Sequence, residues 1–134
     1  MRTYSDLSPD WRVRRQVNCW LRSHRPALSA AAWSQEFGRY AHCEPRLLSF
    51  LQQYLQRYSG IELSRVRPSD RLVEDLKFPL VCWFDWSWSL CDDFARVFNT
   101  DISDCFDETQ IITVSDLLVF LSERVRCEAA VSSF

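Results

Sequence analysis

The nucleophilic and acid–base residues of this 134-residue chain are not arranged for catalysis. The two histidines, His24 and His42, both lie in the N-terminal third, and the sequence contains no Ser/His/Asp grouping and no glycine-rich phosphate loop. Cys82, beside a run of aromatic residues, is the one nucleophile in a distinctive setting. Apolar surroundings raise the pKa of a thiol and make it inert. We therefore expect a protein that is not an enzyme.

The cysteines and histidines also do not predict a metal site. Six cysteines are present, but none forms a closely spaced CxxC pair. His42 adjoins Cys43, whereas a metal site needs three or four converging ligands. We expect free thiols and no bound metal.

Charge is divided unevenly along the chain. Residues 1–67 carry a net charge of +6 and residues 68–123 carry −9, and the whole chain carries −2. The arginines of the first half are spread at helical spacing, and the acidic half would repel phosphates, so nucleic acid is not an expected partner. The acidic half favours a protein partner with a basic surface, or attraction within the chain.

Length and hydropathy predict a water-soluble protein. The sequence has no stretch near the roughly 20 apolar residues that a membrane-spanning helix needs, and residues 1–6 contain no apolar signal core. We expect a cytoplasmic protein that does not bind membranes and that is a monomer or a weak dimer.

Apolar residues recur mostly at helical spacing and predict an all-α protein. In the first half, residues 8–10 predict a helix start with Ser8 as the cap, and this helix extends to about His24. Ser29 is expected to cap a second helix. Pro45 begins the clearest apolar stripe, which Gly60 is placed to end.

The second half predicts shorter elements around a Trp-rich segment, residues 78–88. Ser69 is expected to cap a short helical turn before this segment. A helix with Trp88 on its inner face then runs to residues 99–101. Thr113 and Asp116 resemble a capping box, which begins a last helix through about Arg126.

Three of these motifs occur in the order found in acyl carrier proteins. Residues 70–76 resemble the acidic turn before the carrier serine, residues 98–102 resemble the end of the second helix, and residues 111–121 resemble the entry to the last helix. The chain is also similar to a group of uncharacterised bacterial proteins labelled as acyl carriers. The resemblance implies a four-helix, acyl-carrier-like bundle over residues 44–126, preceded by a two-helix arm (1–43) and followed by a tail (127–134).

The sequence departs from this family at the phosphopantetheine attachment site. A carrier protein has the motif Asp-Ser-Leu at this site, and the serine carries phosphopantetheine. Depending on which flank is aligned, this chain has Phe84 or Leu80 at that position, and neither accepts a phosphodiester. The nearest hydroxyls are Ser87 and Ser89. Ser87 is the better attachment candidate, because a carrier serine lies exposed at a helix N-terminus.

Two functions therefore remain open. The first is a non-catalytic, acyl-carrier-like protein that acts through protein binding and carries no cofactor. The second is a genuine carrier with phosphopantetheine on Ser87 or Ser89. Residues expected at a binding surface are aromatic or acidic: Trp83, Trp86, Asp92, Asp93, Asp101 and Asp104, with Asp107 and Glu108 nearby. The Trp-rich segment is expected either to be covered by Trp11, Trp20, Trp33 and Phe37 of the arm, or to be exposed for a partner protein or an acyl chain.

Overall fold

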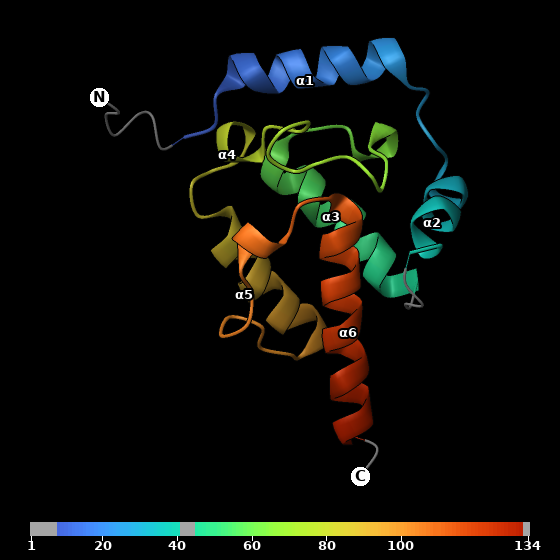
Figure 1. The fold of residues 1–134 in the computed structure, drawn as a ribbon, viewed down its shortest axis with the longest axis vertical. Helices are drawn as coiled ribbons and strands as arrows, with labels where there is room; N and C mark the ends of the chain where they lie inside the picture. Colours follow the sequence, from blue (N-terminus) through green and yellow to red (C-terminus); the bar gives the residue numbers. More distant parts are fainter. Residues whose placement is uncertain (1–7, 41–44, 133–134) are drawn as a thin grey trace.

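Figure 1 presents a computed structural model of the chain, which describes residues 8–40 and 45–132. Its elements are α1 (Trp11–His24), α2 (Ala30–Gly38), α3 (Pro45–Ser59), η2 (Leu63–Arg65), α4 (Phe78–Val81), α5 (Trp86–Phe98), η3 (Glu108–Gln110) and α6 (Val114–Ser132), where η marks a 3-10 turn. Over these ranges the backbone forms no strand, only an isolated bridge between Arg71 and Thr113. The predicted all-α class is confirmed. No helix in the described part of the chain has both the length and the apolar content needed to cross a membrane.

The N-terminal helices begin at side-chain caps. Asp10, rather than the expected Ser8, caps α1: its Oδ1 accepts from the backbone N–H of Arg12 at 3.1 Å and of Val13 at 3.2 Å. The carboxylate does this because the helix begins two residues later than the Ser-Pro pair predicts, at Trp11 rather than Pro9. Ser29 caps α2, as expected, through a 3.2 Å bond from the Ala32 N–H.

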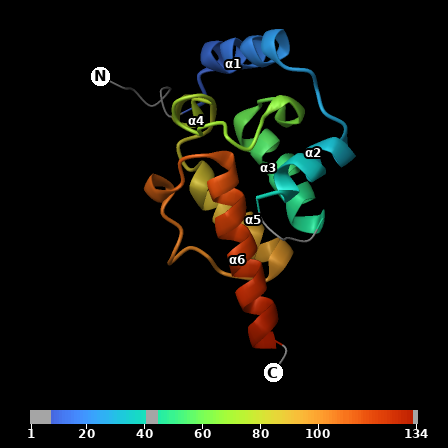
Figure 2. The same ribbon diagram turned by 45° about the vertical axis from the view of Figure 1, so that its right-hand side comes forward.

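Helix α3 supplies the centre of the core. Its apolar stripe is buried as the spacing predicts, and it ends at Gly60, whose φ of 68° is the left-handed conformation that favours glycine. The buried members of the stripe are Leu47, Leu48, Phe50, Leu51, Leu55 and Tyr58. Helix α6 packs against α3, and its C-terminal part extends past the other helices (Figure 2).

The two N-terminal helices share the core with the rest of the chain. Helix α1 lies across one end of the molecule and packs on α4, while α2 packs on α3 (Figure 1). Two hydrogen bonds join α1 to α4: the Asp10 N–H donates to the Leu80 carbonyl at 2.7 Å, and Arg14 Nη2 donates to the Val81 carbonyl at 2.6 Å. Trp33 of α2 is fully buried and donates from Nε1 to the Leu63 carbonyl at 2.8 Å.

The segment between η2 and α4 is a series of turns. It includes one helical turn near the predicted place, in which the Asp75 N–H donates to the Arg71 carbonyl at 3.0 Å, but the predicted Ser69 cap is not found. Asp70 organises this segment instead. Its buried carboxylate accepts from both Nη atoms of Arg25 and, at 2.8 Å, from the Arg67 N–H. The turns form because Asp70 bonds backward along the chain to Arg67, where a helix cap would bond forward.

The predicted capping box at the start of α6 is present. The Asp116 N–H donates to Thr113 Oγ1 at 3.1 Å, and the Thr113 N–H donates to Asp116 Oδ2 at 3.0 Å. Helix α6 then extends to Ser132, six residues beyond the expected end at Arg126.

Candidate functional site

The Trp-rich segment is divided between the core and the surface. Phe78 and Trp86 point inward and form an edge-to-face pair with ring centroids 5.2 Å apart. Trp83, Phe84 and Trp88 point outward, and their relative exposures are 52%, 63% and 72%. Three large apolar side chains are therefore left in water within six residues of chain, around the N-terminus of α5.

The aromatic residues of the N-terminal arm do not cover this segment. Trp11 and Trp20 are exposed on α1, and Trp33 and Phe37 are buried between α2 and α3. The expectation that these four residues pack over the segment is wrong. Helix α1 docks through backbone and arginine hydrogen bonds on α4, which is the first part of this segment, and Trp83, Phe84 and Trp88 beyond α4 remain exposed.

The expected inward position of Trp88 is also wrong. Helix α5 begins at Trp86, and its buried side is made by Trp86, Leu90, Cys91 and Phe94. Trp88 lies off this stripe, because two residues in a helix rotate a side chain by about 200°. The expected surface residue Trp86 is only 8% exposed and forms a floor under its exposed neighbours.

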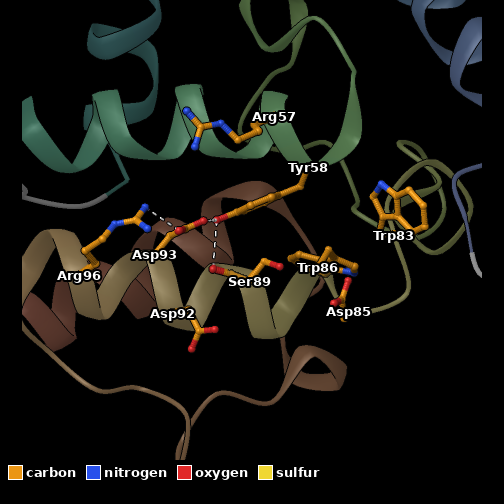
Figure 3. A pocket seen from close by; sticks show the side chains of 9 residues that line it. All are labelled: Arg57, Tyr58, Trp83, Asp85, Trp86, Ser89, Asp92, Asp93 and Arg96. Atoms are coloured by element: carbon orange, nitrogen blue, oxygen red, sulfur yellow. Dashed lines mark hydrogen bonds and ion pairs between the residues drawn. The ribbon is translucent and has the colours of Figure 1, made fainter.

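A first hollow of about 520 Å³ lies between α3 and α5, and we call it the Tyr58 hollow (Figure 3). Tyr58 of α3 donates from its hydroxyl to Asp93 of α5 and, at 3.3 Å, to the Ser89 carbonyl. Arg96 donates to the other Asp93 oxygen at 2.7 Å. Burial, and then the bond to Asp93, raise the pKa of the Tyr58 phenol, so it stays a donor. Asp93 is therefore held by contacts within the chain, whereas Asp92, which also lines the hollow, is exposed.

A second hollow of about 400 Å³ lies on the other side of α5, and we call it the acidic hollow. It is lined by Trp88 and Phe106 and by the carboxylates of Asp92, Asp107 and Glu108, with no lysine or arginine among its lining residues. The side-chain and backbone hydrogen bonds of Thr109 lower the pKa of Asp107, so its carboxylate is charged at neutral pH. An indole face beside carboxylates with no basic residue in the same hollow is suited to a lysine or arginine side chain.

The two serines fit a phosphodiester poorly. Ser87, the second residue of α5, is half-buried and lines the acidic hollow, where Asp92, Asp107 and Glu108 would repel a phosphate. Ser89 lines the Tyr58 hollow, but it lies further inside the helix, and its N–H donates to the Asp85 carbonyl at 3.1 Å. That donor is therefore unavailable to an anion.

The remaining expected acidic residues lie on the loop after α5. Asp101 and Asp104 are both exposed, and Asp101 accepts from the Ser103 N–H at 2.9 Å. That bond, together with the stronger one from the Ser103 hydroxyl, lowers the pKa of Asp101. Neither residue lines the Tyr58 hollow or the acidic hollow. They add negative charge to this side of the molecule without shaping a pocket.

Among the described residues, no group of three histidine, cysteine or acidic side chains converges as a metal site would need. His42 and Cys43 lie outside the described residues. Cys82 is buried, and this burial raises the pKa of its thiol to about 12, which makes it a poor nucleophile.

Comparison with known protein families, with curated proteins and with solved structures found no match. The acyl-carrier resemblance therefore remains a prediction from the sequence motifs.

Sequence reasoning missed the α3 side of the Tyr58 hollow, and it did not include Phe84 among the residues expected at a binding surface. Tyr58 is the last aromatic residue of the α3 stripe. Its hydrogen bond to Asp93 depends on the packing of α5 beside α3, which the sequence patterns do not give. The i, i+3 spacing of Asp93 and Arg96 was a readable sign that Asp93 has a partner on its own helix.

Proposed function

We propose that this chain is a non-catalytic binding protein that docks a protein partner on the surface around the N-terminal half of α5. The observation that carries the proposal is the exposure of Trp83, Phe84 and Trp88 beside two hollows with charged walls. Tryptophan is among the residue types that dominate binding energy at protein interfaces.

The exposed aromatic residues support binding because α1 packs on residues 78–81 and leaves Trp83, Phe84 and Trp88 exposed. Trp88 alone has an exposed fraction of 72%. Apolar surface in water is unfavourable by roughly 25 cal/mol per Å², and a contiguous exposed patch marks an interaction site more often than scattered residues do.

The charge of the surface indicates the character of the partner. Asp92, Asp107 and Glu108 line the acidic hollow, which has no basic lining residue, and Asp101 and Asp104 extend the negative charge. A partner with a basic surface would be attracted to this side and oriented on it. Nucleic acid and anionic membrane surfaces would be repelled.

The finer fold prediction belongs to the same proposal. We propose that residues 44–126 adopt an acyl-carrier-like arrangement, and that the chain acts in the bacterial cytoplasm as a docking protein without a prosthetic arm. The motif order in the sequence supports this arrangement, and the carboxylates around Ser87 support the loss of the phosphate.

Photo-crosslinking in cells tests the docking surface. Benzoylphenylalanine is placed at position 88, and in a matched control at position 40, because Tyr40 is an exposed aromatic residue just after α2. We expect a discrete protein adduct from position 88 and none from position 40. Position 88 giving no adduct, or both positions giving the same adducts, would contradict the proposal.

A mass measurement tests the carrier alternative. The purified chain is incubated with coenzyme A and a broad-specificity phosphopantetheinyl transferase, alongside Ser87→Ala, Ser89→Ala and a known carrier as positive control. We expect no mass gain. A phosphopantetheine gain that disappears in one serine variant would instead establish a carrier and its attachment site.

A further inference from the structure

The surface around α5 contains a third hollow, which we call the aromatic groove. It has a volume of about 350 Å³ and lies between α4, the start of α5 and η3. Phe78 and Trp86 are its buried floor, and Trp83, Phe84 and Val73 are exposed residues that line it. Glu108 is the only charged residue among those that line it.

The aromatic groove is continuous with the two other hollows. It shares Glu108 and Thr109 of η3 with the acidic hollow. It also shares Trp83 and Trp86 with the Tyr58 hollow. An apolar depression is thus bordered on one side by a wall that carries negative charge only.

We infer that the aromatic groove seats one large apolar side chain of the protein partner, and that a lysine or arginine next to it in the partner sequence enters the acidic hollow over Trp88. This inference rests on the proposed function and specifies which part of the partner is recognised. A groove of about 350 Å³ is near the lower limit of small-molecule sites, roughly 300–1,000 Å³, and suits a single anchoring side chain. The partner element is therefore a short basic segment with an apolar anchor.

Charge distinguishes this occupant from a free acyl chain. A fatty acid would bring its carboxylate to a groove that has Glu108 at its edge and Asp107 beyond it. The carboxylate of a fatty acid would be repelled by these like charges, whereas a basic side chain would gain a charge-assisted hydrogen bond.

Selection from a phage-displayed library of random 12-residue peptides tests the inference on the full chain. Enriched peptides are synthesised with a fluorescent label, and their affinities are measured by anisotropy. The targets are the wild type, Phe84→Ala in the groove, Glu108→Lys at its edge, Trp88→Ala on α5, and the control Tyr40→Ala. All four substituted positions are exposed, so the variants are expected to fold, and thermal melting checks this.

We expect the enriched peptides to share one large apolar residue next to lysine or arginine. Phe84→Ala and Glu108→Lys should each weaken binding at least tenfold, and Tyr40→Ala should leave it within twofold. Peptides that lose affinity with Trp88→Ala but not with Phe84→Ala would overturn the groove inference and leave the proposed docking surface standing. No enrichment, or affinity unchanged in all variants, would overturn both. Enriched peptides that lack basic residues, or that decanoate displaces, would overturn the inferred occupant.

Discussion

Gly60 is where the docking of α1 can be tested by adding a single methyl group. This residue ends α3 with a φ of 68°, and a Cβ there would lie 2.6 Å from both Cδ and Nε of Arg14. Arg14 cannot move aside freely, because its Nη2 donates to the Val81 carbonyl at 2.6 Å. Asn18 holds the same turn through a 3.0 Å bond from Nδ2 to the Gly60 carbonyl.

The expected loss of stability in Gly60→Ala has two parts. The left-handed backbone conformation is unfavourable for alanine by about 1 kcal/mol. Displacing Arg14 breaks a hydrogen bond from a charged donor, which contributes about 2 kcal/mol. The free energy of unfolding should therefore fall by about 3 kcal/mol in the wild-type background, and by only about 1 kcal/mol when Arg14 is already alanine.

Urea denaturation followed by tryptophan fluorescence and circular dichroism measures this double-mutant cycle. Gly38→Ala is the matched control, because no atom lies within 4 Å of its added Cβ, and it should stabilise the protein by about 0.5 kcal/mol. An equal effect of Gly60→Ala in both Arg14 backgrounds would refute the contact between Gly60 and Arg14, and with it the docking of α1 described above.

Three other variants or reactions test the fold and the thiol chemistry. Asp70→Ala leaves the partly buried Arg25 without its carboxylate and should lower the free energy of unfolding by about 3 kcal/mol in urea titration; a change below about 1 kcal/mol would show that the pair is not structural. Thr113→Ala removes the capping acceptor of α6 and should reduce stability by about 1 kcal/mol in the same titration, while an unchanged midpoint would argue against the cap. Because burial raises the pKa of Cys82 from 9.0 to about 12, its thiolate fraction at pH 8 falls by about 10³, so iodoacetamide should modify exposed Cys19 well before Cys82 in peptide mass spectra; equal rates would contradict its burial.

Local patterns predicted those parts of the fold that depend on neighbours in sequence. Ser29, Gly60 and the Thr113–Asp116 pair act within four residues of their own position, so composition and spacing were sufficient to find them. The α3 stripe was predictable for the same reason. The short helix α4 was missed, although Pro79 near its start is a readable sign of a helix N-terminus.

The exposure of the Trp-rich segment could not be predicted, because it depends on where α1 docks. The bonds that place α1, from Asp10 to Leu80 and from Arg14 to Val81, join residues about 70 positions apart. No spacing rule connects them. The inward assignment of Trp88 was wrong because Trp88 lies about 200° around the helix from both Trp86 and Leu90, which form the buried side of α5.

The proposed docking surface also combines segments that are distant in sequence. Tyr58 and Asp93 meet only because α3 and α5 pack side by side, and Glu108 borders Trp88 and Phe84 only because η3 folds back toward the start of α5 (Figures 1 and 3). The sequence predicted the types of residue at the surface. It did not predict their division into an apolar groove and an acidic hollow.

The most direct test of the account uses the partner protein that is identified by crosslinking from position 88. Its Kd for the purified chain is measured by isothermal titration calorimetry. The account predicts that Trp88→Ala raises Kd at least tenfold, whereas the control Tyr40→Ala changes Kd less than twofold. It also predicts that Asp92→Lys raises Kd by a larger factor at low salt than at high salt. Equal affinity of the wild type and Trp88→Ala, with both proteins folded, would contradict the claim that this surface is the docking site.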